Sequence, residues 1–205
     1  MKNSKITRRT FLKVSAIGAG GVLLSACGQS TGTVIPQKLK IIGKENGSKM
    51  NIGIIYFSHT GHTRFAAQNL EEKLSSLGHT VIIEPLKPVE PFSPSAATAQ
   101  LSSVPEIGTH DLLVLASPVN GGRMSAPMAS FLDQTGSLQG RQVIFLVTHF
   151  FPRMWGASQT IQAMADKCTA KGAMVVGDAD VQWTFSTPVK KVESAVDQIS
   201  ALLQA

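Results

Sequence analysis

A six-residue segment, residues 58–63, combines three hydroxyl side chains and a glycine immediately before a helix-like pattern. Backbone N–H groups and the helix dipole favour an anion at the start of a helix, and Gly61 lets a ligand come close to the backbone. The segment has no lysine and no Gly-x-Gly-x-x-Gly, which argues against a nucleotide-hydrolase loop and a dinucleotide loop. We therefore predict a site for a phosphate monoester, formed by Ser58, His59, Thr60, Gly61, His62 and Thr63.

A second segment, residues 148–156, offers flat apolar surfaces and a proton carrier. It contains Phe150, Phe151 and Trp155, any of which could stack on a planar ligand. The alternative for the two phenylalanines is a place in the core at a strand end, whereas Trp155 lies farther into the loop. His149 is the candidate catalytic residue, because an imidazole changes its protonation near neutral pH.

Metal chemistry is not expected, although three histidines belong to these segments. His59, His62 and His149 have no carboxylate or cysteine beside them at ligand spacing. Cys168 lies on an apolar stripe of a helical pattern, which predicts a core residue. Lipidation of Cys27, argued below, would leave Cys168 as the one thiol, so we expect no disulfide within the chain.

Alternating short apolar runs and patterns of period 3.6 must position these segments. The apolar runs predict strands at residues 51–57, 80–84, 111–116, 143–148 and 173–181. The periodic stretches predict helices at residues 62–77, 124–132, 161–168 and 187–203, the last with Thr187 as N-cap, and a short helix around 95–103. Strands that alternate with helices predict an α/β fold with a doubly wound, five-stranded parallel sheet. Ligands of such sheets bind at the carboxyl ends of the strands, where both segments lie.

The phosphate segment resembles the phosphate loop of the flavodoxin-like family, Ser/Thr-x-Thr-Gly-x-Thr directly after the first strand. Ser58, Thr60, Gly61 and Thr63 match this pattern, and the preceding Tyr56-Phe57 matches as well. The resemblance implies FMN as the cofactor and the strand order 2-1-3-4-5.

Residues 117–128 are similar to the second flavin loop of that family, and residues 131–136 resemble the WrbA-type NAD(P)H:quinone oxidoreductases. The resemblance implies that the isoalloxazine ring lies against Pro118, Val119, Asn120, Gly121 and Gly122, and that Thr148, Phe150 and Trp155 bind the cofactor from the third loop. Many relatives have an aromatic residue where Asn120 or Gly121 stands here. Ring stacking on that side is therefore not carried over, and the aromatic residues of the third loop are its alternative source.

The charge of the 205-residue chain is distributed very unevenly. The formal net charge is +6, yet residues 1–26 contain five basic residues and no acid. From Met50 onward ten basic and twelve acidic residues leave a net charge of −2. A nucleic-acid-binding domain carries its own basic face, so a nucleic-acid partner is excluded. A charge of −2 is also small for an electron carrier of the strongly acidic flavodoxin type.

The N-terminal basic residues belong to a predicted export signal, residues 1–26. Residues 7–13, Thr-Arg-Arg-Thr-Phe-Leu-Lys, resemble the twin-arginine motif, and an ordinary secretory signal is the alternative. Residues 24–27, Leu-Ser-Ala-Cys, resemble a lipobox, which implies lipidation of Cys27; a buried cysteine in an uncleaved helix is the alternative. We expect a lipidated flexible tether at 27–49 and a flavodoxin-like domain at 50–205.

These patterns together predict an exported, lipid-anchored, extracytoplasmic FMN oxidoreductase that transfers electrons to a quinone or a similar small acceptor. Its reductant would be NAD(P)H or, because NAD(P)H is scarce outside the cytoplasmic membrane, a quinol. Two alternatives stay open: a one-electron carrier that serves a redox protein, and a flavin-free binding lipoprotein of the same fold. An oligomer stays open as well.

Overall fold

The computed structural model describes residues 48–186 and 188–204. The predicted signal (1–26), Cys27, nearly all of the predicted tether and the predicted N-cap Thr187 lie outside the described residues. No helix within the described ranges is long and apolar enough to cross a membrane.

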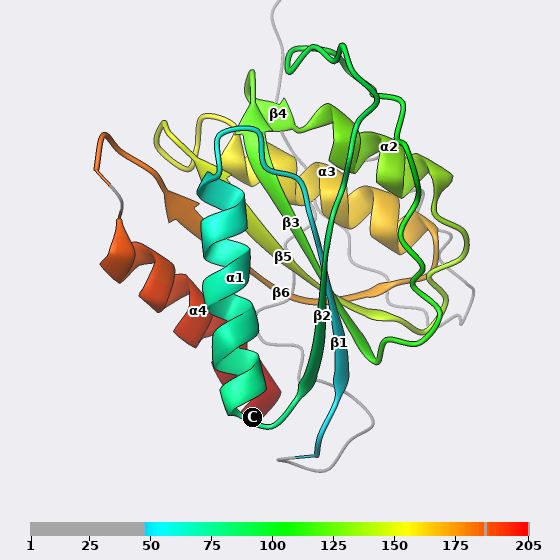
Figure 1. Ribbon diagram of the computed structural model, residues 1–205, viewed down its shortest axis with the longest axis vertical. Coiled ribbons are helices and arrows are strands. Elements are labelled where there is room, and N and C mark those ends of the chain that lie inside the picture. Colours follow the sequence, from blue (N-terminus) through cyan, green and yellow to red (C-terminus); the bar gives the residue numbers. More distant parts are fainter. Residues whose placement is uncertain (1–47, 187, 205) are drawn as a thin grey trace, which may run out of the picture. The chain divides into compact units, whose positions relative to one another are not determined.

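The centre of the described structure is a sheet of five parallel strands in the order β2-β1-β3-β5-β6 (Figure 1). The strands are β1 (Asn51–Tyr56), β2 (Thr80–Pro85), β3 (Leu112–Asn120), β5 (Gln142–His149) and β6 (Met174–Gln182). A two-residue strand, β4 (Arg123–Met124), pairs antiparallel with the end of β3. Counted without β4, this order is the predicted 2-1-3-4-5, so the doubly wound α/β fold is confirmed.

Within residues 48–186 and 188–204, four helices cover the two faces of the sheet. Helices α1 (His62–Ser76) and α4 (Val189–Gln204) pack on one face, and α2 (Ala126–Gln134) and α3 (Ala157–Ala170) cover the other (Figure 1). Every residue of β5 is buried, as a central strand with helices on both sides requires. The four long predicted helices are therefore confirmed, with Met124 placed in β4 rather than in the second of them.

The predicted short helix around residues 95–103 is wrong. The connection from β2 to β3 contains no helix, and an isolated bridge joins Pro88 to Leu101. Residues 95–103 are mostly small or polar, so a short helix there would have no apolar face to bury against the domain. The connection is held to the domain elsewhere, since the Ala99 N–H donates to Ser130 Oγ on α2 at 2.9 Å.

The third strand is longer than its apolar run. Residues 117–120, predicted as a loop, continue β3 and form a short hairpin with β4. A continuous apolar run marks the part of a strand that is buried on both faces. Residues 118–120 are only half-buried, so the apolar run ends before them although the strand itself continues.

Candidate functional site

The carboxyl ends of β1, β3 and β5 bring the three predicted loops to one edge of the sheet. Pro118 on β3 is the register partner of Thr148 on β5. The hydroxyls of Thr63, at the start of α1, and Thr148 lie 2.7 Å apart and are both buried. The space beside Gly156 is filled, since a Cβ atom there would lie 2.7 Å from Val119 Cγ1 and 2.9 Å from Gly122 Cα. The loops thus contact one another directly.

The first loop ends in a helix start without a side-chain cap. Gly61 is the N-cap residue of α1, with a φ of 90° that favours glycine, and it offers no side chain to the first-turn N–H groups. His59 and Thr60 are exposed beside it. Ser58 Oγ is buried and has no hydrogen-bond partner. Free N–H groups and an unpartnered hydroxyl together favour an anionic ligand.

The second loop is a tight β-hairpin. Gly121 and Gly122 have φ values of 56° and 78°, and Asn120 faces Arg123 across the turn, as in a two-residue type I′ turn. A Cβ atom on either glycine would meet nothing within 4 Å, so the turn borders open space. The Asn120 Nδ2 atom is buried and unpartnered although the residue as a whole is only half-buried.

The base of this hairpin is closed by two buried serines. Ser117 Oγ lies 2.9 Å from Ser125 Oγ and accepts a hydrogen bond from the Ser125 backbone N–H at 3.2 Å. Ser125 is also the N-cap residue of α2. The pair therefore fixes the hairpin to the start of the helix and limits its movement.

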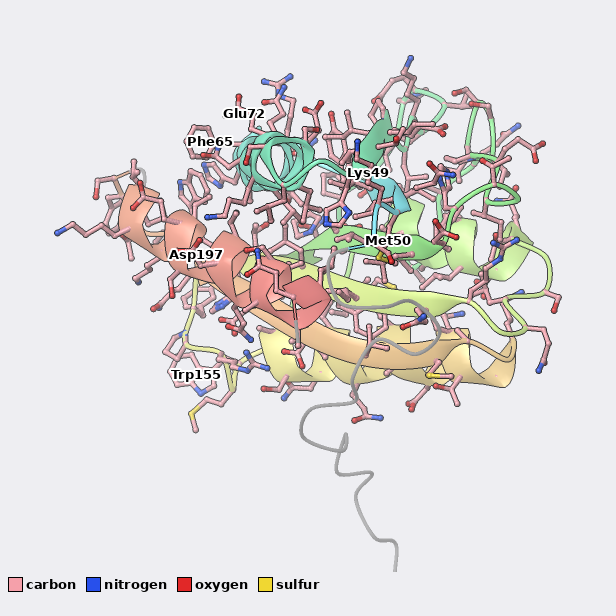
Figure 2. The ribbon with its side chains drawn as sticks, turned by 90° about the horizontal axis from the view of Figure 1, so that it is seen from below. Lys49, Met50, Phe65, Glu72, Trp155 and Asp197 are labelled. Carbon is pink, nitrogen blue, oxygen red and sulfur yellow. The ribbon has the colours of Figure 1, made fainter. Side chains whose placement is uncertain are left out.

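The third loop exposes a cluster of aromatic side chains. The exposed fractions are 47% for Phe150, 59% for Phe151 and 63% for Trp155, so the alternative that the phenylalanines are core residues is wrong. Figure 2 shows Trp155 extending outward from the loop before α3. Phe185, 98% exposed after β6, adds a fourth ring, with its centroid 5.3 Å from that of Phe150. A role for Phe185 could not be predicted, because an isolated aromatic residue in a polar segment has no periodicity.

His149 does not face solvent but takes part in a charged network. Its side chain is 3% exposed; Nδ1 lies 2.5 Å from the Phe151 carbonyl oxygen and Nε2 lies 2.6 Å from Asp180 Oδ2. Arg153 bonds to Asp180 and, at 2.7 Å, to Asp178. Burial is the largest cause that lowers the pKa of His149; the Phe151 hydrogen bond opposes it, and the charges of Arg153 and Lys191 add to it.

This network ties the third loop to β6, and sequence reasoning missed it. Asp178 and Asp180 interrupt the apolar run of β6 at a spacing of two, so both lie on one face of the strand. That interruption was the available signal. The network gives His149 a direct part in positioning the loop, while its role in proton transfer stays a prediction.

The three histidines have different neighbours. The His62 ring stacks on Trp183 with centroids 4.3 Å apart, and the His59 ring meets Phe92 edge-on at 6.2 Å. His149 is bonded to Asp180. Within the part of the chain that the structure describes, no group of three or more His, Cys, Asp or Glu could hold a metal ion.

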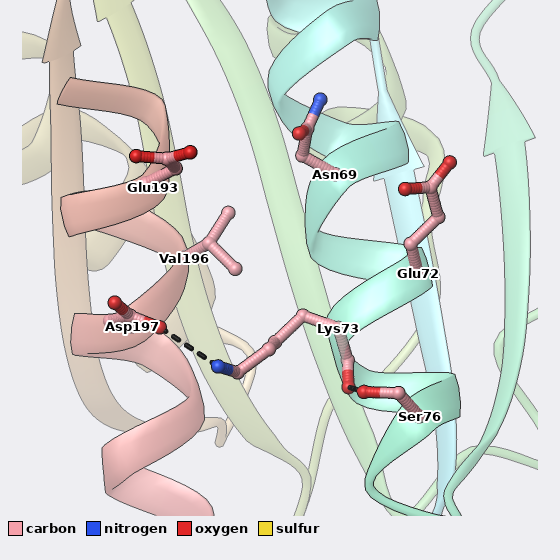
Figure 3. Close-up of a pocket in the computed structure, with 7 residues that line it drawn as sticks. All are labelled: Asn69, Glu72, Lys73, Ser76, Glu193, Val196 and Asp197. Atoms are coloured by element: carbon pink, nitrogen blue, oxygen red, sulfur yellow. Dashed lines mark hydrogen bonds and ion pairs between the residues drawn. The ribbon is translucent and has the colours of Figure 1, made fainter. Parts of the chain in front are cut away.

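Two surface hollows differ in their relation to the loops. One of about 350 Å³ adjoins the phosphate loop and is lined by Ser58, His59, Lys87 and Phe92 among others. The other, of about 460 Å³, lies between the later turns of α1 and α4, and Lys73 bridges to Asp197 across it at 3.0 Å (Figure 3). It contains none of the predicted site residues, because its α1 residues lie toward the end of the helix away from the phosphate loop.

The fold and the three loops define a flavodoxin-like α/β protein with a candidate phosphate site at the carboxyl edge of its sheet. Residues 50–187 match the family model described as NADPH-dependent FMN reductase. The chain belongs to this family.

Individual relatives and solved structures agree with this assignment. The chain is 30% identical over 98 residues to an NAD(P)H dehydrogenase (quinone) of Cupriavidus metallidurans, covering 44% of this chain and 49% of that protein. A protein of the same name from Acidovorax ebreus is 30% identical over 95 residues, or 43% and 48% of the two chains. The chain thus matches about half the length of these curated relatives.

Solved structures of flavodoxins and flavoproteins share the fold. A flavoprotein in complex with FMN from Lactobacillus acidophilus NCFM has a TM-score of 0.56 at 18% identity, covering 74% of this chain and 99% of that one. A WrbA-like flavodoxin from Agrobacterium tumefaciens also has a TM-score of 0.56, at 16% identity, covering 76% and 96%. At these identities the likeness shows the fold.

Proposed function

We propose that the chain is an FMN-binding oxidoreductase that passes electrons to a quinone or a similar small acceptor. The observation that carries the proposal is a pair of buried, unpartnered polar atoms, Ser58 Oγ and Asn120 Nδ2, at the ends of the neighbouring strands β1 and β3. A buried polar group without a partner costs about 1–3 kcal/mol, which a ligand that bonds to it removes. Membership of the FMN reductase family names FMN as that ligand.

The residues present fit FMN at its phosphate end. The uncapped start of α1, Ser58 and the exposed Thr60 supply N–H and O–H donors. Gly61, with its positive φ, leaves the backbone open. The buried Thr63 hydroxyl is paired with Thr148, so these two residues contribute by fixing the first loop to the third. A set of neutral donors suits a single phosphate group.

FMN, when bound, supplies the redox chemistry by accepting and releasing electrons, and the protein orients it and its reaction partner. The exposed rings of Phe150, Phe151 and Trp155 border the site and offer apolar, aromatic surface. Such surface suits a planar apolar acceptor. The curated relatives named NAD(P)H dehydrogenase (quinone) support the same class of acceptor.

Spectroscopy tests this function. The protein incubated with FMN and desalted is expected to keep the visible absorption of oxidised flavin, which should bleach on addition of NADH, NADPH or a quinol and return with a quinone. Ser58→Ala is expected to weaken FMN binding, whereas Ser76→Ala, which removes an exposed hydroxyl bonded to the Lys73 carbonyl, leaves it unchanged. Folded protein that retains no flavin would refute the proposal and favour the flavin-free alternative.

The one-electron carrier and the oxidoreductase are distinguished by the electron acceptor that each one uses. A reductase turns over a small quinone with reductant and needs no protein acceptor. A carrier is reduced slowly by nucleotides and quinols and passes electrons to a redox protein. The domain charge of −2 favours the first behaviour, because a dedicated carrier relies on strong charge to dock on its partner.

We also propose that the protein is exported by the twin-arginine route and anchored through a lipid on Cys27. The support is the pattern of residues 7–13 and 24–27. Replacement of Arg8 and Arg9 by lysine is expected to retain the precursor in the cytoplasm, and Cys27→Ala to release the exported protein from the membrane fraction. Export that persists in the double-lysine variant would point to an ordinary secretory signal instead.

A further inference from the structure

The side chain of Asn120 has an arrangement that the protein alone does not explain. Its Nδ2 atom is buried without a hydrogen-bond partner, whereas the amide of Asn69, on α1, donates to the Phe65 carbonyl at 2.8 Å. A buried amide donor without an acceptor destabilises the folded state. An apolar residue at the last position of β3 would avoid this cost.

The backbone around Asn120 is held in place by its neighbours. Its register partner is Arg123 on β4, and the turn between them is formed by Gly121 and Gly122 in left-handed conformations. The Ser117–Ser125 hydrogen bond closes the base of the hairpin. The backbone that carries the amide is therefore fixed, and the turn beside it borders open space, since a Cβ atom on either glycine would meet nothing within 4 Å.

We propose that the Asn120 side chain is a hydrogen-bond donor to a carbonyl of the flavin ring and thereby raises the reduction potential of the bound FMN. This inference rests on the proposed function. The ring carbonyls gain negative charge when flavin is reduced, so a donor aimed at them binds reduced FMN more strongly than oxidised FMN. Asn120 thus acts on the cofactor through its amide, in addition to any contact made by its backbone.

The measurement is the ratio of the dissociation constants of oxidised and reduced FMN. Asn120→Leu keeps the size of the side chain but removes the donor. The ratio is expected to fall about tenfold, as for the loss of one hydrogen bond to a charged group. For a two-electron couple, a tenfold change lowers the midpoint potential by about 30 mV. Asn120→Asp, which also adds a negative charge beside the ring, should lower the potential further.

A second readout separates this role from a structural one. Without FMN, Asn120→Leu is expected to be at least as stable as the wild type, because it removes a buried unpartnered donor. A residue kept only for the stability of the hairpin would show the opposite change. The matched control is Asn69→Leu, which makes the same substitution in the hollow between α1 and α4 and should leave the potential unchanged.

The outcomes are distinct. A lower potential in Asn120→Leu with unchanged or higher stability of the FMN-free protein supports the inference. A potential equal to that of the wild type, in a variant that binds FMN, overturns it while the proposed function stands. If the Leu variant does not fold, the reduction potentials of Asn120→Ser and Asn120→Asp are compared in its place. The Ser side chain is smaller and keeps a donor, so equal potentials in these two variants also overturn the inference. A wild-type protein that binds no FMN overturns both proposals.

Discussion

Replacement of Gly156 by alanine should disturb the packing between the second and third loops. Gly156 is the N-cap residue of α3 and has a φ of 123°, which L-residues rarely adopt. The added methyl group would lie 2.7 Å from Val119 Cγ1, 2.9 Å from Gly122 Cα and 3.2 Å from the Gly122 carbonyl carbon. Two of these three atoms are backbone atoms of the hairpin turn, so relief requires the turn itself to move.

The size of the effect follows from two costs. The backbone conformation costs about 1–3 kcal/mol for a residue with a Cβ atom. Overpacking against a rigid neighbour costs about 1–3 kcal/mol more. The sum is roughly 2–6 kcal/mol of unfolding free energy. A domain of this size loses roughly 2–4 °C in Tm for each kcal/mol, so a fall of several degrees or more is expected.

Thermal unfolding and FMN titration of one variant pair test this reasoning. Gly140→Ala is the matched control, since its φ is 73° and nothing lies within 4 Å of the new methyl group. Both variants should lose stability, but Gly156→Ala should lose about 1–3 kcal/mol more, the overpacking cost. Only Gly156→Ala should weaken FMN binding. Equal losses in the two variants, with FMN affinity unchanged in both, would refute the claim that the loops are packed together.

Three further predictions concern buried groups. Thr63→Val and Thr148→Val should each lower the free energy of unfolding by about 1–3 kcal/mol, measured by chemical denaturation. The double variant should lose less than the sum of the two, because the shared 2.7 Å hydrogen bond is lost only once, and strict additivity would contradict this. Burial lowers the pKa of His149 below its ordinary 6.5, so the unfolded chain takes up a proton at a higher pH than the folded chain does. The free energy of unfolding should therefore fall as the pH drops below about 6.5, and His149→Gln should flatten this slope in unfolding curves. A slope of opposite sign would mean that the Asp180 carboxylate outweighs burial. Burial raises the pKa of Cys168 to about 12, so its thiol should not react with an alkylating reagent at about pH 8 while the protein is folded. Peptide mass spectrometry should find Cys168 unmodified in the folded protein and modified in denaturant. Rapid labelling of the folded protein would show instead that the thiol is accessible.

The sheet and its order were predictable because the signal is local and repeated. Each central strand is an apolar run bounded by polar residues, and the 3.6-residue pattern of α4 is clear over its whole length. The position of the phosphate loop follows from the same logic, since it requires only a strand, a Gly-containing turn and a helix in succession. The failed helix at 95–103 shows the limit, because small residues between prolines have some helical propensity but no apolar face to bury.

The site details that escaped prediction depend on contacts between distant residues. Asp180 meets His149 and Arg153 across about 30 positions of sequence, and Thr63 meets Thr148 across 85. No local pattern encodes such pairs. The exposure of Phe150 and Phe151 was likewise undetermined, since an aromatic pair after a buried strand suits a core end and a ligand surface equally well.

The contacts among the loops have a consequence for how a ligand would affect the protein. The first loop is joined to the third by Thr63 and Thr148, the third to the second by the packing of Gly156, and the third to β6 by Arg153. A cofactor that bonds Ser58 on one side and Asn120 on the other would span loops that are already connected, so little ordering would oppose its binding. Tight binding in turn stabilises the folded state, and this added stability rises with the logarithm of the FMN concentration once that concentration exceeds the dissociation constant. The unpartnered Ser58 Oγ and Asn120 Nδ2 atoms are therefore better explained as ligand-binding groups than as polar atoms that folding left unsatisfied.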